Sequence, residues 1–327
     1  MQKREKSSNF ARDNQFSVKK VALTLSSGGA RGMAHIGAIN ALEERGYRIT
    51  HISGCSIGSL IGGIYACGKI TEAREWFSKL DKQQVFSLTD FSIGLSHIVK
   101  GEKVLRAIQE WVPDRQIEDL PIPSVFVATD LINSRPVVFR SGSLFEAIRA
   151  SISIPLCFEP VHRDHTLLVD GGLVDPFPLD LAERDEDTLL AGVNISGRSR
   201  MAWRVENRES REESGELKEE NGESRVESLL SKFGTRAEEL WSKVSKDIDD
   251  IHSESDINYL SLVNRTIDIQ IQTASQIAIE RFKPEILVEM PQDAYTTFDF
   301  DKAEQIIDNG YELMVKALDN YEQNRDK

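Results

Sequence analysis

Residues 49–65, ITHISGCSIGSLIGGIY, predict a short buried strand, a tight turn and a helix in immediate succession. The centre of this stretch, Gly54-Cys55-Ser56-Ile57-Gly58, matches G-x-S-x-G, the turn that lifts a serine to the top of a sheet between a strand and a helix. Glycine at Gly54 and Gly58 relieves crowding at such a turn and lets neighbouring backbone approach closely. Serine between glycines also occurs in ordinary turns, so Ser56 is a candidate nucleophile that needs support from the rest of the chain.

A second glycine-bearing segment lies upstream of this turn. Residues 21–25 predict a buried strand, residues 26–32 a tight loop, and residues 33–44 a helix with an apolar face. The loop contains Gly28-Gly29-Ala30-Arg31-Gly32, and successive N–H groups at a helix N-terminus suit a phosphate or a developing oxyanion equally. A dinucleotide site would need the spacing G-x-G-x-x-G and an acidic residue closing the second strand, and the sequence has neither.

A third segment, Asp170-Gly171-Gly172, follows the apolar run 167–169, where a strand would end. An aspartate serves as the base for a serine if its carboxylate lies within hydrogen-bond reach of the hydroxyl and burial raises its pKa. Aspartate before glycine is also common in simple turns. The order of the three segments therefore suggests an oxyanion loop, a nucleophile and its base.

Together these segments resemble the patatin-like phospholipase family over most of residues 21–196 and, more weakly, over residues 258–311. Ala128-Thr129-Asp130-Leu131, residues 147–155 and Phe158-Glu159-Pro160-Val161 also look like that family. The resemblance implies an oxyanion loop at Gly28, Gly29, Ala30, Arg31 and Gly32, a nucleophile at Ser56 and a proton acceptor at Asp170, which would make a serine–aspartate dyad.

A catalytic triad with histidine is the alternative to this dyad. In the chain order serine, acid, histidine it would need a late histidine on a structured loop. His252 lies in an acidic, polar stretch, and His162 and His165 lie in a predicted hairpin turn. We therefore expect all six histidines, which also include His35, His51 and His97, to be surface or satisfied polar residues.

Two residues of the oxyanion loop need separate interpretation. Ser27 stands where the family pattern begins with glycine, and serine tolerates a positive φ poorly, which puts the first amide of the loop in question. Arg31 could attract an anionic headgroup or thioester phosphate, or hold the loop through an ion pair. We favour the structural role for Arg31.

Composition and charge exclude several classes of protein. A net charge of −13 argues against nucleic acid as a partner and against general attraction to anionic bilayers. Cys55, Cys67 and Cys157 are too few for a disulfide framework and suggest a reducing, cytoplasmic environment, with Cys55 packed beneath the turn. The sequence shows no metal-ligand cluster, and neither a metal nor an organic cofactor is expected.

The chain is predicted to fold as one three-layer α/β/α domain around a mostly parallel sheet. Residues 1–20 form a basic, disordered tail without an export signal, 21–197 the catalytic core, 198–256 a polar and helical insertion, and 257–327 a closing helix-strand-helix. Further predicted strands are residues 123–128, 136–139, 189–195 and 284–289, with a helix over 301–321 and a capping box at Ser143 and Glu146. Residues 267–271 alternate like a strand, but their flanks and the family resemblance suggest a helix, which we favour.

Within the insertion, residues 204–224 are dense in glutamate and predict a solvated segment, whereas residues 226–248 carry apolar side chains at helical spacing. That helix would pack on the core or a partner, or act as a lid that contacts lipid. Residues 49–68 lack charge but contain too much glycine and serine for a bilayer span, so membrane contact would be peripheral.

These features predict a serine esterase of the phospholipase A type, acting on a lipid or acyl-ester substrate through a Ser56–Asp170 dyad and an acyl-enzyme. One alternative is an acyl-CoA thioesterase or transacylase that uses the same site. Another is a catalytically weak regulatory or membrane-associated interaction protein that keeps the fold. Headgroup, acyl-chain length and oligomeric state do not follow from the sequence.

Overall fold

β1 (Lys19–Leu25) lies at the centre of the sheet, and its last five residues are fully buried, as a strand covered on both faces requires. It pairs in parallel with β2 (Tyr47–Cys55) on one side and with β7 (Thr188–Gly197) on the other. The computed structural model describes residues 18–88, 102–155, 158–198 and 259–325.

The sheet has eight strands in the order β5-β6-β3-β2-β1-β7-β8, and β4 pairs with β3 off this path. The strands from β3 to β8 along this order run parallel, whereas β4, β5 and β6 form antiparallel pairs. The remaining strands are β3 (Ser124–Asp130), β4 (Arg135–Phe139), β5 (Val161–Arg163), β6 (Thr166–Asp170) and β8 (Ile286–Pro291).

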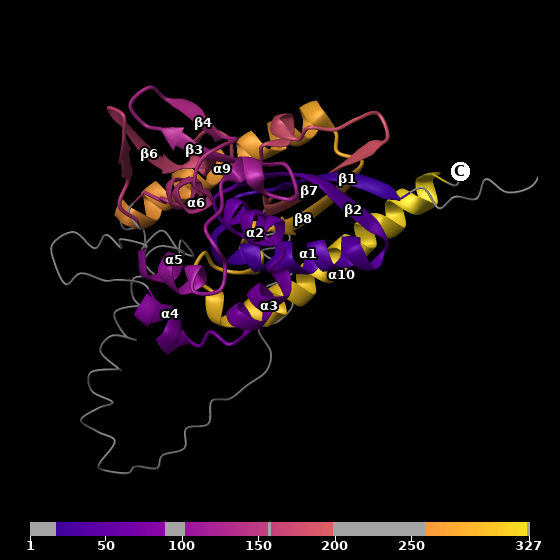
Figure 1. Ribbon diagram of the computed structural model, residues 1–327, viewed down its shortest axis with the longest axis horizontal. Coiled ribbons are helices and arrows are strands. Elements are labelled where there is room, and N and C mark those ends of the chain that lie inside the picture. Colours follow the sequence, from indigo (N-terminus) through magenta and orange to yellow (C-terminus); the bar gives the residue numbers. More distant parts are fainter. Residues whose placement is uncertain (1–17, 89–101, 156–157, 199–258, 326–327) are drawn as a thin grey trace, which may run out of the picture.

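The sheet lies between α9 on one face and α1, α2 and α10 on the other (Figure 1). Two separate apolar clusters account for this layering, because Phe177 and Leu190 pack with α9 while the larger cluster joins β1 and β2 to the opposite helices. The helices are α1 (Met33–Glu44), α2 (Ile57–Ala66), α3 (Ile70–Ser78), α4 (Lys82–Leu88), α5 (Glu102–Gln109), α6 (Leu144–Ser151), α9 (Tyr259–Phe282) and α10 (Ala303–Arg325). Short 3-10 turns are η1 (Gly29–Gly32), η2 (Ile117–Asp119), η3 (Gly171–Leu173), η4 (Leu179–Leu181), η5 (Gln292–Ala294) and η6 (Phe300–Lys302).

The predicted α/β fold with a mostly parallel sheet is confirmed. Each predicted strand and helix of the core matches an observed element to within a few residues, and residues 267–271 lie in α9. Ser143 caps α6 by accepting a hydrogen bond from the Glu146 N–H, as the capping box predicts. The predicted tail ends earlier than residue 20, because Lys19 and Lys20 begin β1. Residues 1–17, the glutamate-rich segment and the amphipathic stretch 226–248 lie outside the described residues and stay predictions. Among the helices that are described, none combines the length and apolar character needed to cross a bilayer.

α10 packs along α1 through two glycines. A Cβ at Gly37 would lie 1.8 Å from the Ile307 carbonyl oxygen, and a Cβ at Gly310 would lie 2.1 Å from the Ala34 carbonyl oxygen. The two helix backbones therefore approach more closely than any larger side chain permits.

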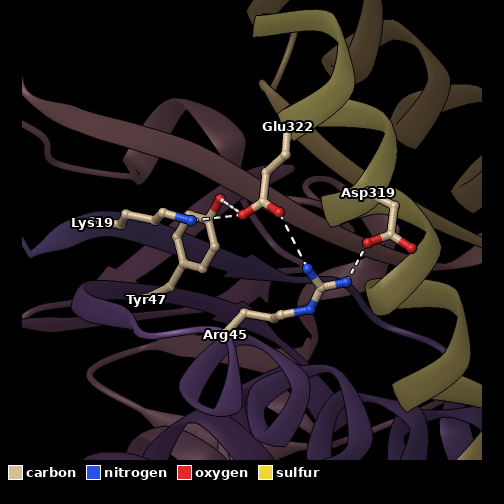
Figure 2. Close-up of polar contacts among 5 residues, drawn as sticks. All are labelled: Lys19, Arg45, Tyr47, Asp319 and Glu322. Atoms are coloured by element: carbon tan, nitrogen blue, oxygen red, sulfur yellow. Dashed lines mark hydrogen bonds and ion pairs between the residues drawn. The ribbon is translucent and has the colours of Figure 1, made fainter. Parts of the chain in front are cut away.

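The C-terminal end of α10 is held by a polar network at the start of β1 and β2 (Figure 2). The Glu322 carboxylate accepts hydrogen bonds from Lys19 Nζ at 2.6 Å, from Tyr47 Oη at 3.1 Å and from Arg45 Nη1 at 3.1 Å. Arg45 also donates to Asp319. The hydrogen bond from Lys19 lowers the pKa of Glu322. Because these side chains are partly exposed, the network fixes the direction of α10 more than it adds stability.

We expect Gly310→Ala to reduce the free energy of unfolding by about 1–3 kcal/mol, because the added methyl group overpacks the contact with α1. Helix propensity alone would favour alanine by about 1 kcal/mol, so a loss would report on the helix contact. Asn320→Ala, at an exposed position of the same helix, is the matched control and should leave stability near that of wild type. Urea unfolding monitored by circular dichroism measures both variants, and a stabilised Gly310→Ala protein would contradict the close approach.

Candidate active site

Ser56 occupies the turn between β2 and α2 in a strained backbone conformation. Its φ of 54° and ψ of −123° are rare for a residue with a side chain and cost about 1–3 kcal/mol. Gly54 and Gly58 make the turn possible, because a Cβ at Gly58 would lie 2.2 Å from the Leu25 carbonyl oxygen and one at Gly54 2.7 Å from the Gly58 carbonyl oxygen. The serine, only 3% exposed, is therefore fixed at the carboxyl end of the central strands.

Strand register brings Asp170 next to Ser56. Cys55 pairs with Val127 of β3, and the following β3 residue, Ala128, pairs with Asp170 of β6. The Ser56 hydroxyl donates a hydrogen bond to one oxygen of the Asp170 carboxylate. The other oxygen accepts the Gly172 N–H at 2.7 Å, so the Asp-Gly-Gly segment caps η3 with the same side chain that faces the serine.

The environment of Asp170 suits a general base. Burial raises the pKa of this carboxyl to about 6, against the opposing effect of the hydrogen bonds from Ser56 and Gly172. A base with a pKa near neutrality can accept a proton and later return it.

The loop before α1 offers backbone N–H groups beside Ser56. Gly29 has a φ of 59°, which glycine adopts without strain, and both Gly28 and Gly29 line the same cavity as Ser56. Among the described residues, the N–H groups of Gly28 and Gly29 have no protein acceptor. The Ala30 N–H, by contrast, already donates to the Thr297 carbonyl at 2.9 Å, so Gly28 and Gly29 are the better placed of the predicted oxyanion donors. Ser27 is not among the residues with positive φ, so serine in place of glycine leaves this loop unstrained.

Arg31 and Gly32 hold the loop in place, and Arg31 also lines the cavity that contains Ser56. The buried Arg31 side chain donates to the carbonyls of Ile195 at 3.0 Å, Gln292 at 3.2 Å and Tyr295 at 2.9 Å. These contacts agree with the structural role expected for Arg31, with backbone carbonyls as the acceptors. A Cβ at Gly32 would lie 2.1 Å from the Ile57 side chain, so this glycine lets the loop pack on the start of α2.

Comparison with known proteins agrees with this geometry. A family model described as patatin-like phospholipase matches residues 23–183. An uncharacterised NTE family protein of Mycobacterium tuberculosis is 33% identical to this chain, over 94% of this chain and 93% of its own length. The chain belongs to the patatin-like phospholipase family.

Two further proteins are similar to parts of this patatin-like chain. Human patatin-like phospholipase domain-containing protein 6 is 30% identical over 89% of the chain, which corresponds to 20% of that protein. VipD from Legionella pneumophila aligns in structure with a TM-score of 0.45 and 16% identity, over 93% of this chain and 67% of its own. Family membership indicates lipid hydrolase activity.

The patatin-like site has two cavities that meet at Ser56. One has a volume of about 100 Å³ and an almost wholly apolar lining, formed on the side of α2 and α3 by Ile57, Leu60, Phe77, Leu80, Val85, Leu88, Val104, Ile152, Ile154, Phe158 and Phe300. The other, of about 70 Å³, is more polar and is closed by α9 through Asn264, Ile267, Asp268 and Ile271. In the polar cavity, Asn264 Nδ2 and Ser27 Oγ are buried without a hydrogen-bond partner among the described residues.

Four of the six histidines are described by the structure, whereas His97 and His252 lie outside the described residues. Of the described residues that line the two cavities at Ser56, none is a histidine. His35 is buried beneath the loop, where its Nε2 meets the Ser26 carbonyl and burial lowers its pKa to about 4. His162 and His165 are exposed. Cys55 is buried, which raises its pKa, so it is a packed thiol. No group of three or more His, Cys, Asp or Glu side chains in the described ranges is arranged to hold a metal ion.

Three positioning residues escaped the sequence analysis. The Ser151 hydroxyl accepts the Ser56 N–H at 2.8 Å and donates to the Val127 carbonyl at 2.6 Å. The Ser153 carbonyl accepts the Asp170 N–H at 2.9 Å, and Thr129 Oγ1 donates to the Asp170 carbonyl at 2.8 Å. All three lie in segments that resemble the family. This resemblance was the signal available in the sequence, but it gave these three residues no role. The end of α6 thus contacts the backbone of both Ser56 and Asp170.

We expect Ser151→Ala to lower kcat by about tenfold with little change in KM, because the strained Ser56 loses the acceptor for its buried N–H, a penalty of about 1–3 kcal/mol. Ser59→Ala is the matched control, since Ser59 Oγ contacts Ser151 Oγ at 2.8 Å without touching Ser56. Ester hydrolysis kinetics and thermal unfolding measure both variants. An equal loss of kcat in Ser59→Ala would show that the effect does not pass through the Ser56 N–H.

Proposed function

We propose that this chain hydrolyses carboxylic esters of phospholipids or lysophospholipids through an acyl-enzyme on Ser56. The observation that carries the proposal is the position of the Ser56–Asp170 pair, where an apolar cavity meets a polar one. A lipid ester has the same two-sided character, with an acyl chain on one side of the scissile bond and a polar alcohol on the other.

The proposed reaction follows from the hydrogen bonds of the site. Ser56 Oγ attacks the ester carbonyl while the Asp170 carboxylate takes the hydroxyl proton, and the N–H groups of Gly28 and Gly29 donate hydrogen bonds to the developing oxyanion. Collapse of the tetrahedral intermediate breaks the bond to the alcohol, which receives the proton from Asp170. Water then attacks the acyl carbon and gives a proton to Asp170. Collapse of this second tetrahedral intermediate breaks the bond to Ser56 Oγ, which takes the proton back from Asp170, and the carboxylic acid is released.

The linings of the two cavities indicate which half of the substrate each cavity would bind. The apolar cavity gains free energy from an acyl chain, at roughly 0.8 kcal/mol for each buried methylene group. The polar cavity offers Asn264 Nδ2 as a donor and Ser27 Oγ as a donor or acceptor, so its natural occupant is the oxygen-bearing alcohol. A substrate in the reverse orientation would leave these buried groups unpaired.

The proposal also includes peripheral contact between the enzyme and a lipid surface. α9 lines the polar cavity with Ile267 and Ile271, while its Leu262, Ile269 and Ile277 are 49%, 52% and 60% exposed. These exposed apolar side chains lie on the helix that covers the site, which supports peripheral contact with lipid close to the entrance.

We expect Ser56→Ala and Asp170→Asn each to abolish most turnover in a screen of phospholipids, lysophospholipids, acyl-CoA and short p-nitrophenyl esters, with the double variant little worse than either. A fluorophosphonate should label Ser56 in the wild type and leave Ser56→Ala unlabelled, because capture needs an activated nucleophile and an oxyanion site. Mass spectrometry locates the label, and thermal unfolding controls for folding. Near-wild-type turnover in either single variant would exclude the dyad.

Activity should rise with pH through about 6 and level off above it, because Asp170 acts as a base only as a carboxylate and burial raises its pKa to about 6. Asp175→Asn is a matched control, since burial raises the pKa of Asp175 to about 7 but the carboxylate has no part in the proposed reaction. The pH dependence of kcat/KM measures both. If the acid limb of the profile disappears in Asp175→Asn, the titration belongs to Asp175 and not to Asp170.

A further inference from the structure

A second hollow of about 640 Å³ lies between α5, α6 and the strands β4 and β5. Its volume falls in the range of about 300–1,000 Å³ that is usual for small-molecule sites. It shares no lining residue with either cavity at Ser56. α5 separates it from the apolar cavity, because Val104 lines that cavity while Leu105 and Arg106 line the hollow. The catalytic reaction proposed above therefore leaves this hollow without a role.

The floor of the hollow is apolar. Leu105, Phe139, Phe145 and Leu168 contribute to its lining, and each is at most 7% exposed when measured over the whole residue. An occupant that covers this floor with hydrocarbon gains free energy in proportion to the apolar area it removes from water. A small hydrophilic ion would gain nothing from it.

The rim of the hollow carries three arginines, Arg106, Arg149 and Arg163, in a chain whose net charge is −13. The Arg163 guanidinium lies 5.4 Å from the centre of the Phe139 ring, so the cation stands directly beside the apolar floor. Its ion pair with Asp164, at 3.7 Å, is exposed and therefore weak enough for another carboxylate to replace.

Two acidic side chains also line the hollow, and one is already engaged. Asp114 accepts hydrogen bonds from Ser143 Oγ at 2.8 Å and from the Phe145 N–H at 3.2 Å, so it serves as a cap for α6. Glu146, exposed on the same helix, is the second. Among the lining residues that the structure describes, three guanidinium groups therefore stand with two carboxylates, which gives this part of the lining a positive charge.

We propose that this hollow binds a single-chain anionic amphiphile, with its carboxylate at Arg106 and Arg163 and its hydrocarbon chain on the apolar floor. Guanidinium groups present paired N–H donors that match a carboxylate, and the buried aromatic and aliphatic floor matches the chain. Binding at this site does not require hydrolysis at Ser56, so the site stands independently of the proposed function.

The test is calorimetric titration of decanoate, below its critical micelle concentration, into full-length Ser56→Ala protein. In that background, Arg106→Gln with Arg163→Gln should weaken decanoate binding by about tenfold or more, because two charged hydrogen-bonding groups are lost. The matched control is Arg74→Gln with Arg184→Gln, which removes the same charge from two exposed, ion-paired arginines outside the hollow and should change Kd by less than about twofold. Arg149 is left intact because it donates to Ser153 Oγ at 2.6 Å, next to the Asp170 contact.

Decanol, butyrate and inorganic phosphate separate the parts of this proposal. Decanol should bind equally to both double variants, and butyrate and phosphate should bind at least about tenfold more weakly than decanoate to the Ser56→Ala background. Thermal unfolding confirms that each variant is folded. Absence of decanoate binding, equal weakening in both double variants, or phosphate binding as tight as that of decanoate would overturn the assignment.

Discussion

The hydrogen bond between the Ser56 hydroxyl and the buried Asp170 carboxylate sets the demands that the rest of the structure meets. Ser56 directly follows β2 and Asp170 ends β6. Both strands pair with the same edge of β3, opposite β4, so their register on β3 determines whether the two residues meet. A shift of one residue in either pairing would turn one side chain to the other face of the sheet. β6 runs antiparallel to β3, and this direction brings the end of β6 to the serine.

Burial of the Ser56–Asp170 pair favours catalysis but costs free energy. The environment that raises the pKa of Asp170 to about 6 also removes the water that would solvate its charge. The protein replaces that water with fixed donors, of which the Gly172 N–H is one. Ser151 does the same for the strained Ser56 backbone, and the adjoining Ser153 ties the Asp170 backbone to the same turn. The end of α6 is consequently a rigid support for two residues that are not adjacent to it in the sequence.

Local chemistry decided which features could be predicted from the sequence. Gly54, Ser56 and Gly58 are constrained by a single turn, so their spacing alone predicts a strand, an elbow and a helix. The Ser151 contact could not be predicted, because a hydroxyl that meets a backbone N–H 95 residues away leaves no periodic pattern. The acceptor of the Ala30 N–H could not be predicted for a similar reason, since it is a carbonyl contributed by Thr297, far along the chain. Asn264 and Asp268 lie on α9, whose approach to the site depends on tertiary packing.

The contact between α1 and α10 also bears on how the protein is made. The hydrogen bond from Tyr311 to Glu44 spans 267 residues, and the glycine contacts beside it span a similar distance. At synthesis rates of about 5–20 residues per second, α1 would emerge some 10–50 s before its partner helix. During that interval the closely packed face around Gly37 has nothing to cover it. The nascent chain therefore carries an apolar surface that a chaperone can hold, and a product that stops before α10 would be prone to aggregation.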